Sequence, residues 1–231
     1  MRLHTATWGD GGRVALLVHG LMADHRTWHE VGPVLADRGY RVVAVDLRGH
    51  GRSGRGGYAP ELFAEDLAET LPAGAELALG HSLGALALAL AVERLRPSRV
   101  VYSEPAWRLG GPHGTLDPAA FALFKRAPRS LVRSFRPDWD AERVTEETRA
   151  LEAWDEKTAH ALSSYRMTDH TPKAPLVPSL VQLSDPSTLV SSEMREEMVC
   201  RGFEVRTVRG ASHTIHRDHL DEFLRSLTGW L

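Results

Sequence analysis

The chain has 231 residues, enough for one large α/β domain with a small insertion but short for two independent domains. Its hydrophobic fraction of 42% and charged fraction of 25% are ordinary for a globular protein that folds in water. The formal net charge of -2 and the pI of about 6.6 give no electrostatic basis for binding nucleic acid or an anionic membrane.

The first part of the chain alternates predicted strands with predicted helices. Residues 13–18 and 41–45 are apolar runs typical of buried parallel strands, and residues 27–38 between them have apolar side chains at helical spacing. Residues 61–71 predict an amphipathic helix that ends at Pro72. This order predicts a mostly parallel, doubly wound sheet with helices on both faces.

Residues 76–95 predict a strand, a tight turn and a helix, with Ser82 at the turn in the sequence Gly-His-Ser-Leu-Gly. A serine on such a strained turn leaves no room for side chains two positions away, which accounts for Gly80 and Gly84. The start of the helix supplies free backbone N–H groups, of which that of Leu83 is the nearest. The pattern alone also fits an ordinary glycine-rich turn, but the flanking strand and helix favour a nucleophile.

The strand pattern stops after residues 99–102 and resumes at residues 179–183. We therefore expect residues 1–105 and 174–231 to form one core domain, and residues 106–173 to form a helical cap inserted into it.

The clearest helices of the predicted cap are residues 118–125 and 141–155. The aromatic side chains of this segment either pack against each other or face a pocket. On the second interpretation, three tryptophans are candidates for lining a substrate pocket: Trp107, Trp139 and Trp154.

The last part of the chain predicts a helix over residues 188–201, a strand over residues 203–208 and a closing helix over residues 220–231. The single cysteine, Cys200, excludes an intramolecular disulfide and fits a reducing compartment, and we expect a buried, structural thiol. The chain shows neither a secretory signal pattern nor an apolar run long enough to cross a membrane, so we expect a cytoplasmic protein.

Several residues whose side chains can take part in catalysis follow predicted strands: Ser82, Glu104, Asp185 and His213. Because the carboxyl ends of parallel strands meet at one edge of a sheet, these side chains are expected to lie near each other. A serine hydroxyl needs a base to take its proton, and a histidine does this when an acid fixes its tautomer. The order serine, acid, histidine is that of an α/β-hydrolase.

Four motifs in order resemble those of the α/β-hydrolase superfamily along nearly the whole chain. They are HGLM at residues 19–22, DLRGHGRSG at residues 46–54, GHSLG at residues 80–84 and GASHTIHRD at residues 210–218. The resemblance implies that the N–H groups of Leu21 and Leu83 form an oxyanion hole and that His213 is the base. His113, His160 and His170 of the insertion show no metal-ligand spacing. We expect neither a metal nor a cofactor.

The acid is the open question. In most members of the superfamily the acid follows the strand after the insertion, in a pattern similar to G-x-x-D-x-x-V-P. When Val190 is placed at the valine of that pattern, Ser187 occupies the position of the acid. Asp185 lies two residues early. Members similar to haloalkane dehalogenases, Renilla-type luciferase and zearalenone-type lactonases instead have a glutamate before the insertion, where this chain has Glu104. We favour Glu104, with Asp185 as the alternative acid.

The resemblance implies a serine hydrolase that cleaves a carboxylic ester or lactone of a small to medium apolar substrate through an acyl-enzyme on Ser82. The alternatives are a carbon–carbon bond hydrolase, a cofactor-free oxygenase, or a non-catalytic receptor for a small ligand. The expected partner is therefore a small molecule, and neither the substrate nor the oligomeric state follows from the sequence.

Overall fold

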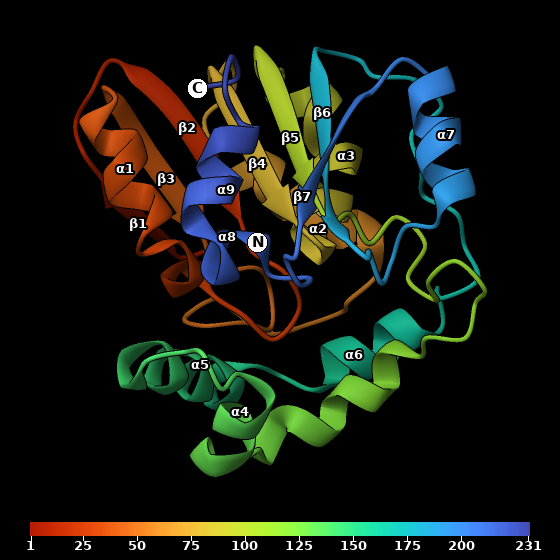
Figure 1. Cartoon of the computed structure of the whole chain (residues 1–231). Helices are drawn as coiled ribbons and strands as arrows, with labels where there is room; N and C mark the ends of the chain where they lie inside the picture. Colours follow the sequence, from red (N-terminus) through yellow and green to blue (C-terminus); the bar gives the residue numbers. More distant parts are fainter.

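The computed structural model describes residues 1–231, and its centre is a sheet of seven strands in the order β1-β3-β2-β4-β5-β6-β7 (Figure 1). Only β1 is antiparallel to its neighbour; every other pair is parallel. The strands are β1 (Thr5–Trp8), β2 (Arg13–Val18), β3 (Tyr40–Val45), β4 (Leu77–His81), β5 (Arg99–Ser103), β6 (Ser179–Asp185) and β7 (Glu204–Arg209). The predicted doubly wound fold is confirmed.

Helices cover both faces of the sheet (Figure 1). The helices of the sheet domain are η1 (His25–Trp28), α1 (Val31–Asp37), α2 (Pro60–Thr70), α3 (Leu83–Leu95), α7 (Ser192–Cys200), α8 (Ile215–Asp218) and α9 (Leu220–Ser226). No helix of the protein combines the length and the apolar character that a membrane span requires.

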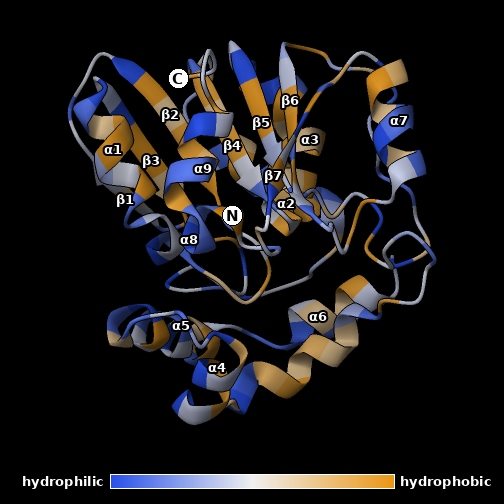
Figure 2. Cartoon of the chain, viewed as in Figure 1, coloured by the Kyte–Doolittle hydropathy of each residue, from blue (hydrophilic) through white to orange (hydrophobic).

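Two hydrophobic clusters lie on opposite faces of the sheet, as expected when successive strand side chains point to opposite sides. In β2, Leu16 and Val18 join a cluster of 34 buried residues with α2, α3 and α7. Ala15 and Leu17 join a cluster of 18 buried residues with α1, α8 and α9. Figure 2 shows the resulting band of apolar residues along the central strands. The rigid sheet holds the loops at its carboxyl edge in fixed places.

Four further helices lie beneath the sheet in Figure 1, on the side where β5 ends. They are the 3₁₀ helix η2 (Pro118–Arg126), α4 (Arg129–Phe135), α5 (Ala141–Ala153) and α6 (Lys157–Ser163). Part of this group has its own small hydrophobic cluster, which includes Val132, Trp139 and Leu151. The boundaries of the core and the cap at residues 105 and 173 stay a prediction.

Some elements differ from the sequence expectation. The edge strand β1 and the short helices α4 and α6 had no clear signal. Helix α7 begins at Ser192, four residues later than expected, because the hydroxyl of Ser191 caps it by accepting from Met194 N–H. The expectation of a buried Cys200 is wrong, since this last residue of α7 is exposed.

The contact between α3 and β2 depends on the absence of a side chain at Gly84. A Cβ atom there would overlap the carbonyl oxygens of Val18 and His19, which are backbone atoms that cannot rotate away. We expect Gly84→Ala to lower the free energy of unfolding by at least about 3 kcal/mol, because the helix must move off the sheet. Urea unfolding measures this loss.

Gly12→Ala is the matched control, because a Cβ atom at Gly12 meets nothing within 4 Å. We expect a change below about 0.5 kcal/mol there. Equal stability of the two variants would contradict the close approach of α3 to β2.

Candidate active site

Ser82 occupies the sharp turn between β4 and α3. Its backbone has φ 52° and ψ −115°, a region that non-glycine residues rarely adopt. A Cβ atom at Gly80 would lie 2.6 Å from the carbonyl oxygen of Gly84, so both glycines are needed for the chain to turn this tightly. The Ser82 hydroxyl donates no hydrogen bond within the protein and is held at the edge of the sheet by the strained backbone alone.

Glu104 follows β5 and is fully buried. Its Oε1 accepts a hydrogen bond from Ser184 N–H (2.8 Å), and its Oε2 accepts one from the hydroxyl of Ser187 (3.1 Å). The same Oε2 lies 3.1 Å from Nδ1 of His213. A buried carboxylate is costly unless such partners surround it, so these contacts fix the direction in which Glu104 points.

His213 lies in the loop after β7, with its side chain 30% exposed. Because Nδ1 faces Glu104, Nε2 is left free on the other side of the ring. The backbone carbonyl of His213 accepts a hydrogen bond from Nε2 of His81, at 2.8 Å. His81 directly precedes Ser82, so this bond joins the loop of His213 to the turn of the serine.

Of the two candidate acids, the structure brings Glu104 to His213 and leaves Asp185 apart. Asp185 is the last residue of β6, is exposed and makes no side-chain hydrogen bond. Ser187, at the position where the family pattern has its acid, donates to the carboxylate of Glu104. The sequence pattern places Ser187 where most of the family has its acid. It predicts neither the bond of Ser187 to Glu104 nor that of Ser184.

The loop of residues 19–22 lies against the serine turn. A Cβ atom at Gly20 would lie 2.8 Å from the His81 ring and 3.1 Å from Cβ of Ser82. The N–H of Leu21 has no acceptor within the protein, and Leu83 is the first residue of α3, where a helix leaves its N–H groups free. Both predicted oxyanion donors are therefore available for a ligand.

Four histidines around these loops are buried: His19, His50, His81 and His216. Burial lowers the pKa of each, to about 3 for His50 and well below the usual value for His81 and His216. The hydrogen bonds of two of these rings also require a neutral nitrogen. Nε2 of His19 accepts from Leu47 N–H (2.9 Å), and Nε2 of His50 accepts from Met22 N–H (3.3 Å). A protonated ring could not accept these bonds, so both rings are neutral.

The three predicted pocket tryptophans lie in different places, and their role stays a prediction. Trp154 is near His50 (ring centroids 6.4 Å apart), which holds the loop of Leu21 through Met22. Trp139 donates from Nε1 to Asp218 (2.9 Å), close in sequence to His213. Trp107 packs in the core against Tyr102 and Phe203.

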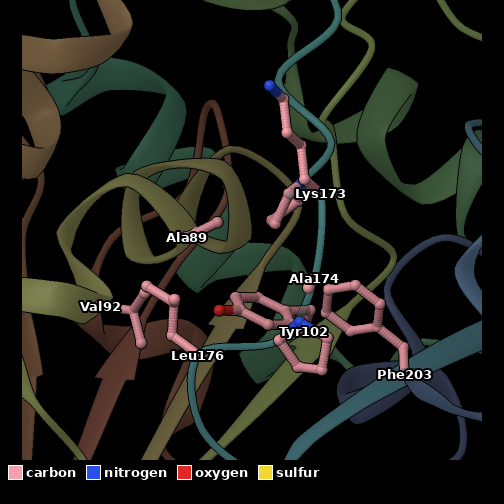
Figure 3. Close-up of a pocket in the computed structure, with 9 residues that line it drawn as sticks. Ala89, Val92, Tyr102, Lys173, Ala174, Leu176 and Phe203 are labelled. Atoms are coloured by element: carbon pink, nitrogen blue, oxygen red, sulfur yellow. The ribbon is translucent and has the colours of Figure 1, made fainter. Parts of the chain in front are cut away.

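A cavity of about 290 Å³ lies elsewhere (Figure 3). Its walls include Val92 of α3, Tyr102 of β5 and Phe203, and the segment 172–176 crosses it. None of the residues at the serine turn lines it, so its volume says nothing about the substrate of Ser82.

One cluster could in principle hold a metal ion. His4, His25 and Asp46 each have a ligand atom within 4.8 Å of the others. However, Asp46 Oδ1 already accepts from the backbone and ring of His25, and Oδ2 accepts from Arg52 N–H. We therefore interpret Asp46 as a carboxylate that organises its loop.

Comparison with known proteins agrees with the fold. The alpha/beta hydrolase family matches residues 15–226, and the chain belongs to this family.

Two relatives carry enzyme names. A pimeloyl-[acyl-carrier protein] methyl ester esterase of Sodalis glossinidius is 37% identical over 129 residues, which are 53% of this chain and 49% of the relative. The match thus spans about half the length of that esterase. A candidate protein-lysine deacylase of Rattus norvegicus is 28% identical over 94% of this chain and 81% of its own.

Among solved structures, an N-formylmaleamic acid deformylase from Pseudomonas putida S16 has a TM-score of 0.82 at 23% identity, covering 97% of this chain and 95% of its own. A thermophilic esterase from Thermogutta terrifontis has a TM-score of 0.77 at 22% identity, covering 99% and 92%. At these identities the likeness shows the fold alone.

The buried neutral histidines predict a pH dependence of stability. In the unfolded chain, histidines bind protons below a pH of about 6.5. In the folded protein the four buried rings stay neutral. Because the unfolded state then binds more protons than the folded state, the free energy of unfolding falls as the pH decreases. Each ring can contribute a loss of up to about 1.4 kcal/mol per pH unit below 6.5. Urea unfolding at pH 7.5, 6 and 5 measures the slope.

His216→Gln should flatten this slope, because glutamine can replace the contact of His216 with Thr27 (2.9 Å) and does not titrate. His113→Gln, at an exposed position, should leave it unchanged. A stability that is constant or rises toward pH 5 would contradict neutral burial.

Proposed function

We propose that the protein is a serine hydrolase that cleaves a carboxylic ester or lactone of a small to medium apolar substrate. The observation that carries the proposal is the contact of His213 Nδ1 with the buried Glu104 carboxylate, beside a serine on a strained turn. In this arrangement Ser82 is the nucleophile, His213 the base and Glu104 the acid. The family membership and the esterase name of a relative support a hydrolase.

In the acylation step, Oγ of Ser82 attacks the substrate carbonyl carbon while Nε2 of His213 takes the hydroxyl proton. The N–H groups of Leu21 and Leu83 donate to the oxyanion. The bond from carbon to the leaving oxygen then breaks, and the imidazolium gives its proton to that oxygen. Glu104 stabilises the imidazolium without taking the proton.

Deacylation repeats these steps with water. His213 takes a proton from the water molecule, the resulting hydroxide attacks the acyl carbon, and the proton returns to Oγ of Ser82 as the acid product leaves. The neutral, buried His81 and His216 cannot replace His213, because their low pKa values make them poor bases near pH 7.

The apolar character of the substrate rests on the tryptophans. The contact of Trp154 with His50, which holds the loop of Leu21, and that of Trp139 with Asp218, near the loop of His213, support these two as walls of a substrate site, whereas Trp107 packs in the core.

A second candidate function is hydrolysis of an N-acyl bond. The relative that matches 94% of this chain has a deacylase name, and the same residues could transfer an acyl group from nitrogen, with His213 protonating the leaving amine. A panel of esters, lactones and N-acyl-lysine derivatives of graded acyl length separates the two candidates by kcat/KM.

Ser82→Ala should abolish turnover of short p-nitrophenyl esters and labelling by a fluorophosphonate, because it removes the hydroxyl that forms the acyl-enzyme. The measurements are initial rates and the mass of the intact protein after labelling. A wild-type protein that neither labels nor turns over any ester of the panel would exclude this proposal in favour of a ligand receptor.

The acid can be tested by removing each candidate carboxylate. Glu104→Gln should lower kcat by about 10²- to 10⁴-fold, because the amide no longer stabilises the imidazolium, whereas Asp185→Asn should change kcat less than about twofold. The two substituted carboxylates differ in burial, since Glu104 is buried and Asp185 is exposed.

Ser187→Asp in the Glu104→Gln background adds a carboxylate where the family pattern has its acid. Because the Ser187 hydroxyl lies 3.1 Å from the same Oε2 that faces His213, we expect partial recovery of kcat. If only Asp185→Asn lost activity, the assignment of Glu104 would be wrong.

A further inference from the structure

Asp218, the last residue of α8, gathers hydrogen bonds from both neighbours of His213. Its Oδ2 accepts from the hydroxyls of Ser212 and Thr214, the latter at 2.9 Å. The two residues that flank His213 are therefore held by one carboxylate, whose side chain is only 12% exposed. The position of the His213 backbone depends on this contact.

The same carboxylate is bound from the helices beneath the sheet. Trp139 donates from Nε1 to Oδ1 at 2.9 Å, and Arg136 donates to Oδ2 at 3.4 Å. Arg136 also donates to the hydroxyl of Ser212, at 2.9 Å. Arg136 and Trp139 lie between α4 and α5, and the bond of Arg136 to Ser212 joins this segment directly to the loop of His213.

A third residue strengthens this junction from the side of α8. The guanidinium of Arg217 lies 3.9 Å from the centre of the Trp139 ring and pairs with Glu147 of α5. It also donates to the carbonyl of Arg143, at 3.2 Å. The Arg217 side chain is only 4% exposed, so the junction is packed and largely shielded from salt.

We propose that Asp218 is a positioning residue that aligns His213 with Ser82 only while Arg136 and Trp139 are docked on it. If the segment 136–139 moves away, the carboxylate loses two of its four side-chain donors, and the loop of residues 212–214 loosens. Docking of the segment between α4 and α5 on Asp218 therefore aligns the base His213 at the same time. This inference rests on the proposed role of His213 as the base.

Asp218→Asn and Trp139→Phe test the proposal. Both should lower kcat by about 10- to 100-fold with little change in KM, because a displaced base weakens the chemical step more than substrate binding. Phenylalanine keeps an aromatic ring at position 139 but is smaller than tryptophan and lacks the N–H that binds Asp218. No hydrogen bond joins Asp218 or Trp139 to Ser82 or Glu104. Amide hydrogen exchange of residues 211–215 should become faster in both variants.

Glu30→Gln is the matched control. It breaks the pair of Glu30 with Arg143, at 2.7 Å, which joins α5 to the start of α1 without touching the loop of His213. We expect a lower Tm, a kcat within about twofold of the wild type and unchanged exchange at residues 211–215.

If Asp218→Asn and Trp139→Phe match Glu30→Gln in kcat and in loop exchange, the positioning role is overturned while the proposed hydrolase stands. If the wild type has no hydrolase activity, the proposed function fails, and the exchange measurement alone still decides whether the segment 136–139 holds the loop.

Discussion

The site depends on a buried carboxylate that the fold must surround with donors. Glu104 lies at the end of the central strand β5 with no exposure to solvent, and an unpartnered charge there would be too costly to retain. Its partners come from two separate places along the chain: Ser184 at the end of β6 with Ser187 just after it, and His213 after β7. The hydrogen bonds that the Glu104 carboxylate requires thus bring the carboxyl ends of β5, β6 and β7 together.

Features set by local constraints were predictable from the sequence. The serine turn needs glycines at fixed positions, the central strands are apolar because both faces are covered, and His213 follows the last strand. These rules predict the sheet, the turn and the free N–H of Leu83 beside it. The preference for Glu104 over Asp185 and the choice of Leu21 as an oxyanion donor rest instead on the resemblance to the family.

Features that depend on distant contacts were not predictable. The edge strand β1 has only four residues and none of them is fully buried, so its pairing with β3 defines it. Cys200 looks like a core residue until the exposed side of α7 is known. The contacts of Ser187 with Glu104 and of Asp218 with Arg136 and Trp139 appear only when segments far apart in the sequence meet.

The pairing of β4 with β5 has a consequence for the geometry of the pair Ser82 and Glu104. His81 is opposite Ser103 in the parallel ladder, and Ser82 N–H donates to the carbonyl of Ser103 at 3.0 Å. The register of one pair of adjacent strands therefore fixes the separation of the serine from the glutamate, whatever the length of the segment inserted after residue 105. A slip of β5 by one residue against β4 would turn the side chains of β5 to the opposite face and displace Glu104 relative to Ser82.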